Sequence, residues 1–587
     1  MTSLMTDDMV VDAWIARLNE SLALGDHARA AGLFGDDGYW RDSLTFGWTI
    51  ETAHGPLAIE HLLREAGNEM PVLRRDGPVT RSALPHCGET LEAQLSWTAP
   101  ALSGRGHLRL TSAASAADPA GWVGATLLTA AESLAGRPPL SLSNRDTEFA
   151  SAHDDTWAER RAAEQAYRDR SPEVLIVGAG HAGLALAARL DHQGVDALVV
   201  EAHARVGDNW RTRYRTLRLH NEICGNHLPY LPFPDSWPMF VPKDKLAGWL
   251  ELYVDALELN VWTSSTVLGG ERDDATGRWA VEVRRAGGEV RTLHPAHVVM
   301  ATGLSGKPWK PALAGAERFA GPILHSSEYD GQVDVAGRSV TIVGTGTSAH
   351  DVAEDVLARG GRPTMLQRSP TTVVSLEQSA RAYQRYRTEE GVRPIADTDL
   401  MVSSIPYNLL QRLHVGLNAS MVDADRDLHA RLRRAGFLVD DSVSFFVKLL
   451  TRFGGYYIDV GASELIADGQ VAVRSGVDVV EAGASDLLLS DGSRLASDLV
   501  VLCTGYTSFG DSIADLFGAA VAERVGEVWG LDESGELRNM WVETAQPGFY
   551  VAGGPLTMCR FYSTSLALLL KARLTGVAEG RAESHVR

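Results

Sequence analysis

The feature that most constrains the fold of this chain is a strand, a glycine-rich turn and a helix that occur in this order twice. In the first copy an apolar strand at 174–177 leads into glycines at G-x-G-x-x-G spacing, and the following helix ends near Gly194. The first glycine permits a tight turn, the second lets the backbone approach a pyrophosphate, and the third lets the helix pack on the strand. These glycines are Gly178, Gly180 and Gly183. The pattern predicts a parallel α/β sheet with a dinucleotide at the helix N-terminus.

The second copy differs from the first at the position that discriminates between cofactors. Its strand ends at Val343 and its helix stops at Gly360. Its predicted nucleotide-binding residues are Gly344, Gly346 and Ser348. After its second strand, Gln367 and Arg368 stand where the first copy has Glu201. A carboxylate accepts hydrogen bonds from ribose hydroxyls and would repel a 2′-phosphate, whereas a guanidinium pairs with that phosphate. We therefore expect Glu201 to bind a ribose and Arg368 to select NADPH over NADH.

The segment that begins at Glu201 reads EAHARVGDNW and resembles the E-x5-G-G-x-W segment of FAD-binding monooxygenases, with Asp208 in place of the second glycine. The resemblance implies that the first site binds FAD and includes Trp210. Three later runs, VVMATG, VVLCTGY and FYVAGG, are apolar strands that end in small residues, which lets the backbone come close to a flat cofactor. We expect all three to return to the FAD fold. Their predicted cofactor contacts are Thr302, Gly303, Thr504, Gly505 and Gly553.

Between the two copies lies FAGPILHSSEY, in which Phe319, Gly321, His325 and Tyr329 have F-x-G-x3-H-x3-Y spacing. This spacing, and its place between two nucleotide folds, resemble the fingerprint of the class B flavin monooxygenases. The Baeyer–Villiger version ends in Trp-Pro, whereas Asp330 follows Tyr329 here, which favours the flavin-containing monooxygenase branch. The resemblance implies a catalytic role for His325, through coupling of domain geometry to NADPH rather than through proton transfer.

The run LRLHNEICGNHLPYLPFPDSWPMFVP is similar to the plant auxin-forming flavin monooxygenases, with the same gap from LH to PFP. Animal-type enzymes place an asparagine near the flavin in this segment. Matching from the PFP puts His220 in that position, with Asn221 beside it. Both are therefore candidate catalytic residues. The resemblance to the whole superfamily spans about residues 173–574.

The first 140 residues lie outside that resemblance and are typical of a small α+β domain. An amphipathic helix is predicted from Val11 to about Leu24, and strand-like segments such as Ala93 to Trp97 follow. The order of WRD, GHLRL and GWVGATLLTA resembles NTF2-like domains that precede flavoprotein modules. This resemblance implies a structural or dimerising role, with a homodimer formed through this domain.

The chain is thus expected to be an α/β protein with two Rossmann-type domains, for FAD and NADPH, behind an NTF2-like domain. The expected limits are 1–140 for the NTF2-like domain, 141–172 for a linker helix, 173–337 for the FAD-binding domain, 338–498 for the NADPH-binding domain and 499–587 for a return to the FAD-binding domain. A helical insertion at about 371–453 either contacts the substrate or covers the NADPH-binding domain.

Composition excludes several other classes of protein. A formal charge of −20 and a pI near 5.4 disfavour nucleic acids and anionic membranes as partners. No run approaches the roughly 18 apolar residues that a membrane span needs. The four cysteines contain no CxxC pair, which argues against a dithiol reductase and fits a reducing cytoplasm. No metal site is predicted.

The resemblance implies an NADPH-dependent flavin-containing monooxygenase whose partners are O2 and a small organic substrate. NADPH reduces FAD, and a C4a-hydroperoxyflavin then transfers one oxygen atom. N- or S-oxygenation and oxidation of a carbonyl compound both stay open as the reaction. Two alternatives share the motifs: an NADPH oxidase, and a non-catalytic regulatory protein that binds FAD and NADPH.

Overall fold

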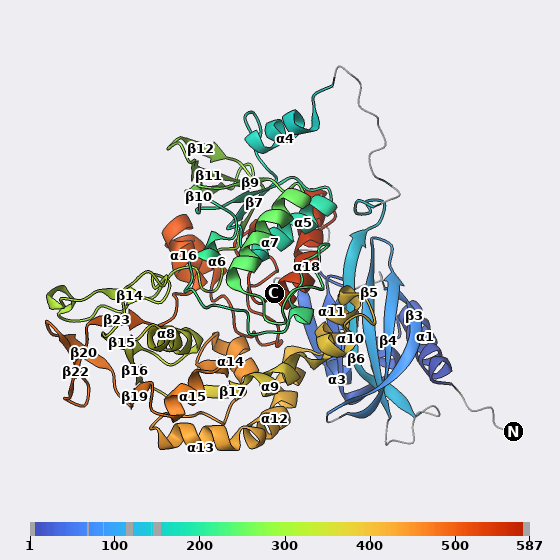
Figure 1. Ribbon diagram of the computed structural model, residues 1–587. Helices are drawn as coiled ribbons and strands as arrows, with labels where there is room; N and C mark the ends of the chain where they lie inside the picture. Colours follow the sequence, from blue (N-terminus) through green and yellow to red (C-terminus); the bar gives the residue numbers. More distant parts are fainter. Residues whose placement is uncertain are drawn as a thin grey trace.

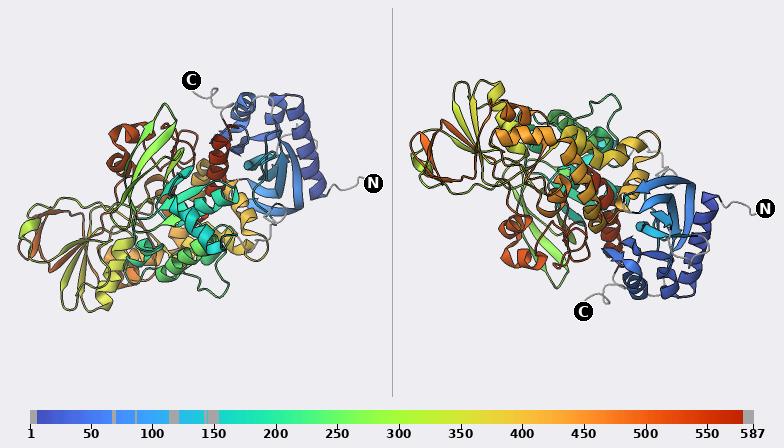
Figure 2. Two further views of the ribbon diagram at one scale, coloured as in Figure 1. Left: turned by 90° about the horizontal axis from the view of Figure 1, so that it is seen from above. Right: turned by 90° about the horizontal axis from the view of Figure 1, so that it is seen from below.

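The computed structural model describes residues 6–66, 70–85, 87–112, 121–141, 144 and 154–578. The N-terminal domain lies at one end of the molecule, a parallel sheet with strands β15 and β16 lies at the other, and a second parallel sheet with β7 lies between them (Figure 1). The two views of Figure 2 show the same separation of the blue N-terminal domain from the far sheet. The mixed α/β class expected from the sequence is confirmed.

The N-terminal domain is a six-stranded sheet with three helices. Its elements are α1 (Asp7–Ala23), α2 (His27–Ala31), β1 (Phe34–Ser43), β2 (Ile50–His54), α3 (Gly55–Glu65), β3 (Val72–Leu84), β4 (Gly88–Thr98), β5 (Leu102–Ser112) and β6 (Trp122–Leu134). The strand order is β2-β1-β6-β5-β4-β3, with β1 and β6 parallel and the other neighbours antiparallel. Helix α1 begins four residues before the expected start because the Thr6 hydroxyl accepts a hydrogen bond from the Met9 N–H. The NTF2-like assignment of this α+β domain stays a prediction.

The two faces of this sheet bury residues of opposite character. Along β4, Leu91, Ala93, Leu95 and Trp97 alternate with Thr90, Glu92 and Gln94, and along β5, Leu108 and Leu110 alternate with His107 and Arg109. Successive side chains on a strand point to opposite faces. The apolar set packs with Trp14 and Leu18 of α1 in one hydrophobic core. The other face therefore carries buried charges that need partners from elsewhere in the chain.

The segment expected to be a linker helix contains α4 (Trp157–Ala166), whose N-terminus has a capping box between Thr156 and Glu159. Residues 142–143 and 145–153 of this segment lie outside the described residues. The expected limits of the linker stay a prediction.

The first parallel sheet has the order β24-β13-β7-β8-β9. Its strands are β7 (Val174–Val177), β8 (Ala197–Val200), β9 (Val261–Trp262), β13 (His297–Met300) and β24 (Phe549–Val551). All four residues of β7 are buried, as a parallel strand covered on both faces requires. Helix α5 (His181–His192) follows β7 and packs against α18 (Leu556–Leu574). Between β9 and β13 the chain forms a small antiparallel sheet of β10 (Thr266–Asp273), β11 (Arg278–Arg284) and β12 (Val290–Leu293), and α7 (Lys243–Ala256) precedes β9.

The second parallel sheet has the order β14-β23-β15-β16-β19. Its strands are β14 (Ile323–His325), β15 (Ser339–Val343), β16 (Arg362–Gln367), β19 (Ala472–Ser475) and β23 (Leu499–Leu502). Helix α8 (Thr347–Ala358) connects β15 to β16, as the second glycine motif predicts. An antiparallel sheet of β20 (Val479–Ala482), β21 (Asp486–Leu489) and β22 (Arg494–Ala496) precedes β23.

Two expectations about this sheet are wrong. The run VVLCTGY is expected in the FAD fold, but β23 pairs with β14 and β15 of the second sheet. The expected limits at 337/338 and 498/499 therefore cut off two strands, β14 and β23, that belong to the second fold. The cause is that a short apolar strand ending in small residues fits the middle of either parallel sheet, and only the long-range pairing decides between them.

The insertion after β16 is largely helical and lies between the second fold and the N-terminal domain (Figure 1). Its elements are β17 (Thr372–Ser375), α9 (Leu376–Ser379), α10 (Gln384–Glu389), α11 (Ile395–Ser403), α12 (Tyr407–Ala424), α13 (Arg426–Arg434), α14 (Phe445–Arg452) and β18 (Tyr456–Asp459). Helix α11 contacts both β5 and α18. The insertion thus covers the N-terminal sheet, a position that the sequence pattern does not reveal.

The C-terminal helix α18 joins the N-terminal domain to the first nucleotide fold, since it packs on β6 as well as on α5. Fifteen of its 19 residues are buried. Across the described ranges, no helix is both long and apolar enough to cross a bilayer.

Candidate active site

The first glycine motif places an open helix N-terminus at the carboxyl end of β7. Gly178 has φ +109°, and a Cβ atom there would lie 2.7 Å from the Ala301 carbonyl oxygen. A Cβ atom at Gly183 would lie 2.1 Å from the Gly178 carbonyl oxygen. Gly180 is the N-cap of α5 and makes no side-chain cap, and a Cβ atom there would have Asn209 Nδ2 as its nearest neighbour, at 3.6 Å. The first and third glycines therefore serve the fold, whereas Gly180 leaves space and free N–H groups for an anion.

Glu201 stands directly after β8, as predicted. Its carboxylate accepts hydrogen bonds from the Ala179 N–H at 2.8 Å and from the His203 N–H at 2.8 Å, and contacts His203 Nδ1 at 2.6 Å. Burial by itself raises the pKa of Glu201, but these hydrogen bonds outweigh burial and lower the pKa below its ordinary value. The carboxylate is therefore ionised at neutral pH, which suits it to bind ribose hydroxyls.

Two buried polar atoms near this helix N-terminus have no protein partner among the described residues: Trp210 Nε1, a donor, and His181 Nδ1. His181 Nε2 lies 2.9 Å from the Gly554 carbonyl oxygen, so Nε2 carries the proton and Nδ1 is an acceptor. The two rings are 6.1 Å apart. Gly553, the expected contact, is buried beside Gly554. An unpaired donor and acceptor beside an uncapped helix fit a polar cofactor such as FAD.

The second glycine motif has the same geometry. Gly344 has φ +123°, and a Cβ atom there would lie 2.5 Å from the Cys503 carbonyl oxygen. Gly346 is the N-cap of α8 without a side-chain cap, and the nearest neighbour of a Cβ atom there would be the Tyr456 carbonyl oxygen at 4.0 Å. Ser348 is half-buried in the first turn, and the buried Ala349 takes the place of the third glycine. This helix N-terminus is open to a second dinucleotide.

The last residue of β16, Gln367, and the residue after it, Arg368, have different environments. Gln367, the last residue of the strand, is fully buried, donates to the Leu438 carbonyl oxygen at 2.9 Å and accepts from the Leu438 N–H at 2.7 Å. Arg368 is exposed, and no side chain or carbonyl oxygen of the described residues hydrogen-bonds to its guanidinium. Gln367 therefore fastens the insertion to β16, while Arg368 is available to a ligand phosphate.

The expected contacts Thr302 and Gly303 follow β13, which brings them to the first motif, where Ala301 approaches Gly178. Thr504 and Gly505 follow β23 instead, which brings them to the second motif, where Cys503 approaches Gly344. The prediction that Thr504 and Gly505 belong to the FAD fold is therefore wrong, because the strand before them is part of the second sheet. The two pairs occupy equivalent places in the two folds.

The segments that follow β13 and β23 cross between the folds and pair with each other. The Trp309 N–H donates to the Gly505 carbonyl oxygen at 3.0 Å, and the Thr504 hydroxyl donates to the Trp309 carbonyl oxygen at 2.5 Å. Arg213 donates to the Ser305 carbonyl oxygen at 3.1 Å and also to the Tyr506 hydroxyl. This paired crossing sets the orientation of one nucleotide fold relative to the other.

His325 ends β14 and is fully buried at this crossing. Its Nε2 donates to the Gly505 carbonyl oxygen at 2.9 Å, and its Nδ1 accepts from the Ser327 N–H at 3.1 Å. Burial lowers the pKa of His325, so the ring is neutral at pH 7. Because protein groups occupy both ring nitrogens, this geometry favours positioning over proton transfer.

The other fingerprint residues also fasten this segment to the second fold. Phe319 packs in a core with Leu366 and Val500. A Cβ atom at Gly321 would lie 2.1 Å from the Asp498 carbonyl oxygen, and the buried Tyr329 hydroxyl donates to Asp355 of α8 at 2.7 Å. The residues of the F-x-G-x3-H-x3-Y fingerprint thus attach one continuous segment to the second fold.

His220 and Asn221 lie in the segment between Trp210 and α7, and the Asn221 side chain hydrogen-bonds to Tyr383 of the insertion. Desolvation lowers the pKa of His220 to about 4, so its ring is neutral at pH 7. Asn221 Oδ1 is buried and has no partner among the described residues, which makes it an acceptor available to a cofactor or substrate. Their catalytic role stays a prediction.

Sequence patterns miss the polar residues between the two folds. Besides Arg213, the Tyr214 hydroxyl donates to Asp351 of α8 at 2.5 Å, and burial raises the pKa of Asp351 to about 7. The signal available in the sequence is the adjacent pair Arg213-Tyr214 shortly after Trp210 in an otherwise unassigned segment. Its partners are distant along the chain, and only the fold brings them together.

A sequence profile described as "Pyridine nucleotide-disulphide oxidoreductase" matches residues 175–403. The match begins at the first nucleotide fold and extends into the insertion. All four cysteines of this chain are free thiols, so the match reflects the nucleotide folds and not a dithiol centre.

Similar solved structures share the fold. A structure of cyclohexanone monooxygenase matches with a TM-score of 0.52 at 16% identity, over 70% of this chain and 89% of that one. OTEMO in complex with FAD and NADP matches with a TM-score of 0.52 at 17% identity, over 70% of this chain and 88% of that one.

Curated relatives give the family. Indole-3-pyruvate monooxygenase YUCCA1 of Oryza sativa subsp. japonica is 30% identical over 338 residues, which are 57% of this chain and 77% of that protein. Probable indole-3-pyruvate monooxygenase YUCCA10 of Arabidopsis thaliana is 29% identical over 57% of this chain and 82% of its own length. With this coverage and the two nucleotide folds, the chain belongs to the class B flavin-dependent monooxygenases, which use FAD and NADPH.

Proposed function

We propose that this enzyme transfers one oxygen atom from O2 to a small organic substrate at the junction of its two nucleotide folds. The observation that carries the proposal is the paired crossing. The first glycine of each fold lies close to the residue at which a crossing segment begins, Ala301 after β13 and Cys503 after β23. Two uncapped helix N-termini are thereby held in a fixed relation, as hydride transfer between two bound cofactors requires.

The residues that would hold FAD belong to the first fold. Gly180 and the N–H groups of α5 face the pyrophosphate, and the ionised Glu201 accepts from the ribose. Trp210 Nε1, His181 Nδ1 and Asn221 Oδ1 supply unpaired polar atoms beside it. Thr302, Gly303 and Gly553 bring backbone close to the cofactor.

The residues that would hold NADPH belong to the second fold. Gly346 and Ser348 line the N-terminus of α8, and Arg368 pairs with the 2′-phosphate. Thr504 and Gly505 lie beside Gly344, and His325 keeps Gly505 in place through its hydrogen bond. His325 and Arg213 thus hold the geometry of the crossing and move no proton.

The flavin, when bound and reduced, supplies oxygen activation at its C4a position. One oxygen atom of O2 enters the substrate and the other leaves as water. The two electrons that reduce this second oxygen atom come from NADPH. The protein excludes bulk water from the reacting atoms, which limits the release of hydrogen peroxide.

A 2-oxo acid is the first substrate class that we propose, because the relatives are named as indole-3-pyruvate monooxygenases. A carbonyl carbon is the atom attacked in such a compound. Amines and thioethers form the second class, since they accept oxygen from the same cofactor chemistry. A screen of both classes for substrate-dependent NADPH consumption and product mass decides between them.

The test of the function is rapid-mixing absorbance of the purified yellow protein, reduced anaerobically with NADPH and then mixed with O2. We expect a long-lived absorbance band that differs from those of oxidised and reduced flavin, and its faster decay when a substrate is present. Immediate return to oxidised flavin with one hydrogen peroxide per NADPH, with every substrate tested, would establish the alternative of an NADPH oxidase.

Replacing Arg368 with alanine is expected to weaken NADPH binding by about 10- to 100-fold and to leave NADH binding nearly unchanged, because a charge-assisted contact to phosphate is worth roughly 1.5–3 kcal/mol. KM values for both coenzymes in NADPH- and NADH-dependent flavin reduction measure the change. Arg362→Ala, at the other end of β16, is the control and retains wild-type discrimination. Equal discrimination in both variants would remove Arg368 from the site.

An NTF2-like identity for the N-terminal domain, a homodimer formed through it and a cytoplasmic location complete the proposal. The order of helices and strands in that domain, with one parallel pair in a six-stranded mixed sheet, supports the first of these. Sedimentation velocity of the full chain tests the second.

A further inference from the structure

Arg560 of α18 is a buried arginine whose whole guanidinium is engaged. Its Nε and Nη2 donate to the two carboxylate oxygens of Asp399 at 2.6 Å each, and its Nη1 donates to the carbonyl oxygens of Gly225 at 2.9 Å and His227 at 2.7 Å. Both charged side chains are at most 4% exposed. Bidentate pairing of this kind fixes geometry as well as charge. Arg560 therefore ties the loop that follows Asn221 to Asp399 of α11.

The same loop lies against side chains of α10 and α18. A Cβ atom at Gly225 would lie 3.9 Å from the Tyr386 ring and 3.4 Å from Thr557 of α18. The Tyr386 hydroxyl donates to Asp399 at 2.8 Å. The position of the loop thus depends on α10, α11 and α18 together.

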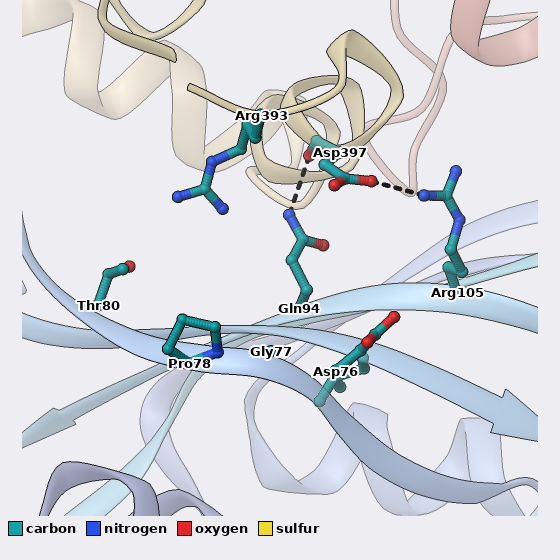
Figure 3. Close-up of a pocket in the computed structure, with 9 residues that line it drawn as sticks. Asp76, Gly77, Pro78, Thr80, Gln94, Arg105, Arg393 and Asp397 are labelled. Atoms are coloured by element: carbon teal, nitrogen blue, oxygen red, sulfur yellow. Dashed lines mark hydrogen bonds and ion pairs between the residues drawn. The ribbon is translucent and has the colours of Figure 1, made fainter. Parts of the chain in front are cut away.

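Helix α11 is in turn held by the polar face of the N-terminal sheet. Arg105 donates to the Asp397 carboxylate at 2.6 Å, and Gln94 donates to the Asp397 carbonyl oxygen at 3.1 Å (Figure 3). All three residues line a cavity of about 240 Å³. Deeper in the sheet, Arg109 donates to the Met401 carbonyl oxygen at 2.8 Å, and Arg41 donates to the Ser403 carbonyl oxygen at 2.6 Å. The start and the end of α11 are both attached.

A buried charge of the N-terminal sheet is also compensated by a residue of the insertion. Glu92, 2% exposed, pairs with Arg109 of its own sheet at 3.0 Å and with Arg385 of α10 at 2.9 Å. Burying these charges is favourable only with partners in place. The polar face is therefore built to receive the insertion.

We propose that the N-terminal domain is a positioning platform: it fixes α11, and α11 fixes the loop at residues 220–227 through Asp399 and Arg560. The inference rests on the proposed function, since it takes Asn221 in that loop to face the reacting cofactor. Arg560 and Asp399 are positioning residues, and Asp397 acts one step further away.

The test compares Arg560→Lys and Asp397→Ala with Arg573→Lys, a matched control on the same helix whose partner is Glu543. Lysine keeps the charge at 560 but loses the fork that binds Asp399 and two carbonyls. Arg105 and Asp397 are 32% and 26% exposed, so Asp397→Ala removes a partly solvated ion pair and leaves a folded protein.

Three readouts apply to each holoenzyme: visible circular dichroism of the bound flavin, the rate of flavin reduction by NADPH, and hydrogen peroxide released per NADPH with substrate present. For Arg560→Lys we expect a changed dichroism spectrum, reduction within about twofold of wild type, and a loss of coupled oxygen transfer on the order of 10- to 100-fold. For Asp397→Ala we also expect a changed dichroism spectrum and a reduction rate close to that of the wild type. The expected loss of coupled oxygen transfer is smaller, roughly two- to tenfold.

Wild-type dichroism in Arg560→Lys, or equal changes in Arg573→Lys, would overturn the platform. So would a change in Arg560→Lys that Asp397→Ala does not share. If the wild-type enzyme itself releases only peroxide, the proposed function fails, yet the dichroism of the three variants still decides the positioning inference.

Discussion

Replacing Gly180 with valine is expected to give a folded protein that lacks FAD and is colourless. A Cβ atom at Gly180 has no protein atom closer than 3.6 Å, and its φ of −74° is open to every L-residue. The fold therefore tolerates the side chain. The branched carbons would instead occupy the space at the N-terminus of α5 where a pyrophosphate would lie, and the ligand would lose its hydrogen bonds to the N–H groups.

Gly346→Val is the counterpart in the second fold. With 4.0 Å to the nearest protein atom and φ −84°, this glycine is equally free to accept a side chain. We expect a yellow protein with full flavin content that NADPH no longer reduces, while dithionite still does. Flavin absorbance per chain and the rate of anaerobic reduction by NADPH are the measurements.

The two valine variants control for each other, and Gly248→Ala controls for handling. A Cβ atom at Gly248, inside α7, meets no atom within 4 Å, so this variant keeps both functions. Full flavin in Gly180→Val would remove the first motif from the FAD site. Loss of flavin in both valine variants alike would show that the two folds do not divide the cofactors.

Glu536→Gln is expected to destabilise the protein by about 3–5 kcal/mol, since it leaves a buried arginine without its counter-charge. Arg41 of β1 donates to both carboxylate oxygens of Glu536, at 2.7 and 2.5 Å, and to the Tyr562 hydroxyl of α18 at 2.6 Å. The side chains of the pair are 2% and 4% exposed. Thr52 adds a hydrogen bond to Glu536 at 2.6 Å.

Denaturant unfolding followed by tryptophan fluorescence measures the loss. Glu481→Gln is the matched control: its partner Arg318 is 55% exposed, and a pair in water is worth about 0–1 kcal/mol. Equal midpoints for the two variants would mean that water reaches Arg41 and that the N-terminal domain is only loosely attached. A large difference would show that the buried Arg41–Glu536 pair attaches the N-terminal domain firmly to the rest of the chain.

The two nucleotide motifs could be predicted from the sequence because each is local. Strand β7 begins and ends where the apolar run predicts, and Gly180 and Gly346 are the N-caps that the spacing implies. In each motif the strand, turn and helix lie within one continuous stretch, so local chemistry determines their structure.

Contacts between distant segments could not be predicted in this way. The run VVLCTGY carries no information on whether β14 and β15 or β13 will pair with it, and the expected sheet for β23 is therefore wrong. Arg560 gives a weak signal, as a charge near the start of an apolar helix. Its partner Asp399 comes from an insertion of irregular pattern, and no spacing rule connects the two. The buried charges of β4 and β5 resemble ordinary solvent-facing positions until α11 is seen on them.

The order of the strands also determines when each half of the enzyme can form during synthesis. All five strands of the second sheet lie between Ile323 and Ser475 or at Leu499–Leu502, so the ribosome delivers that sheet complete. The first sheet is incomplete until β24 is translated, and α5 lacks its packing against α18 until that helix is translated. Both β24 and α18 follow the whole second fold in the sequence. The NADPH half can therefore be assembled while the FAD half still has an open edge at β13, and a chain that stopped before Phe549 would leave that edge exposed to association with other chains.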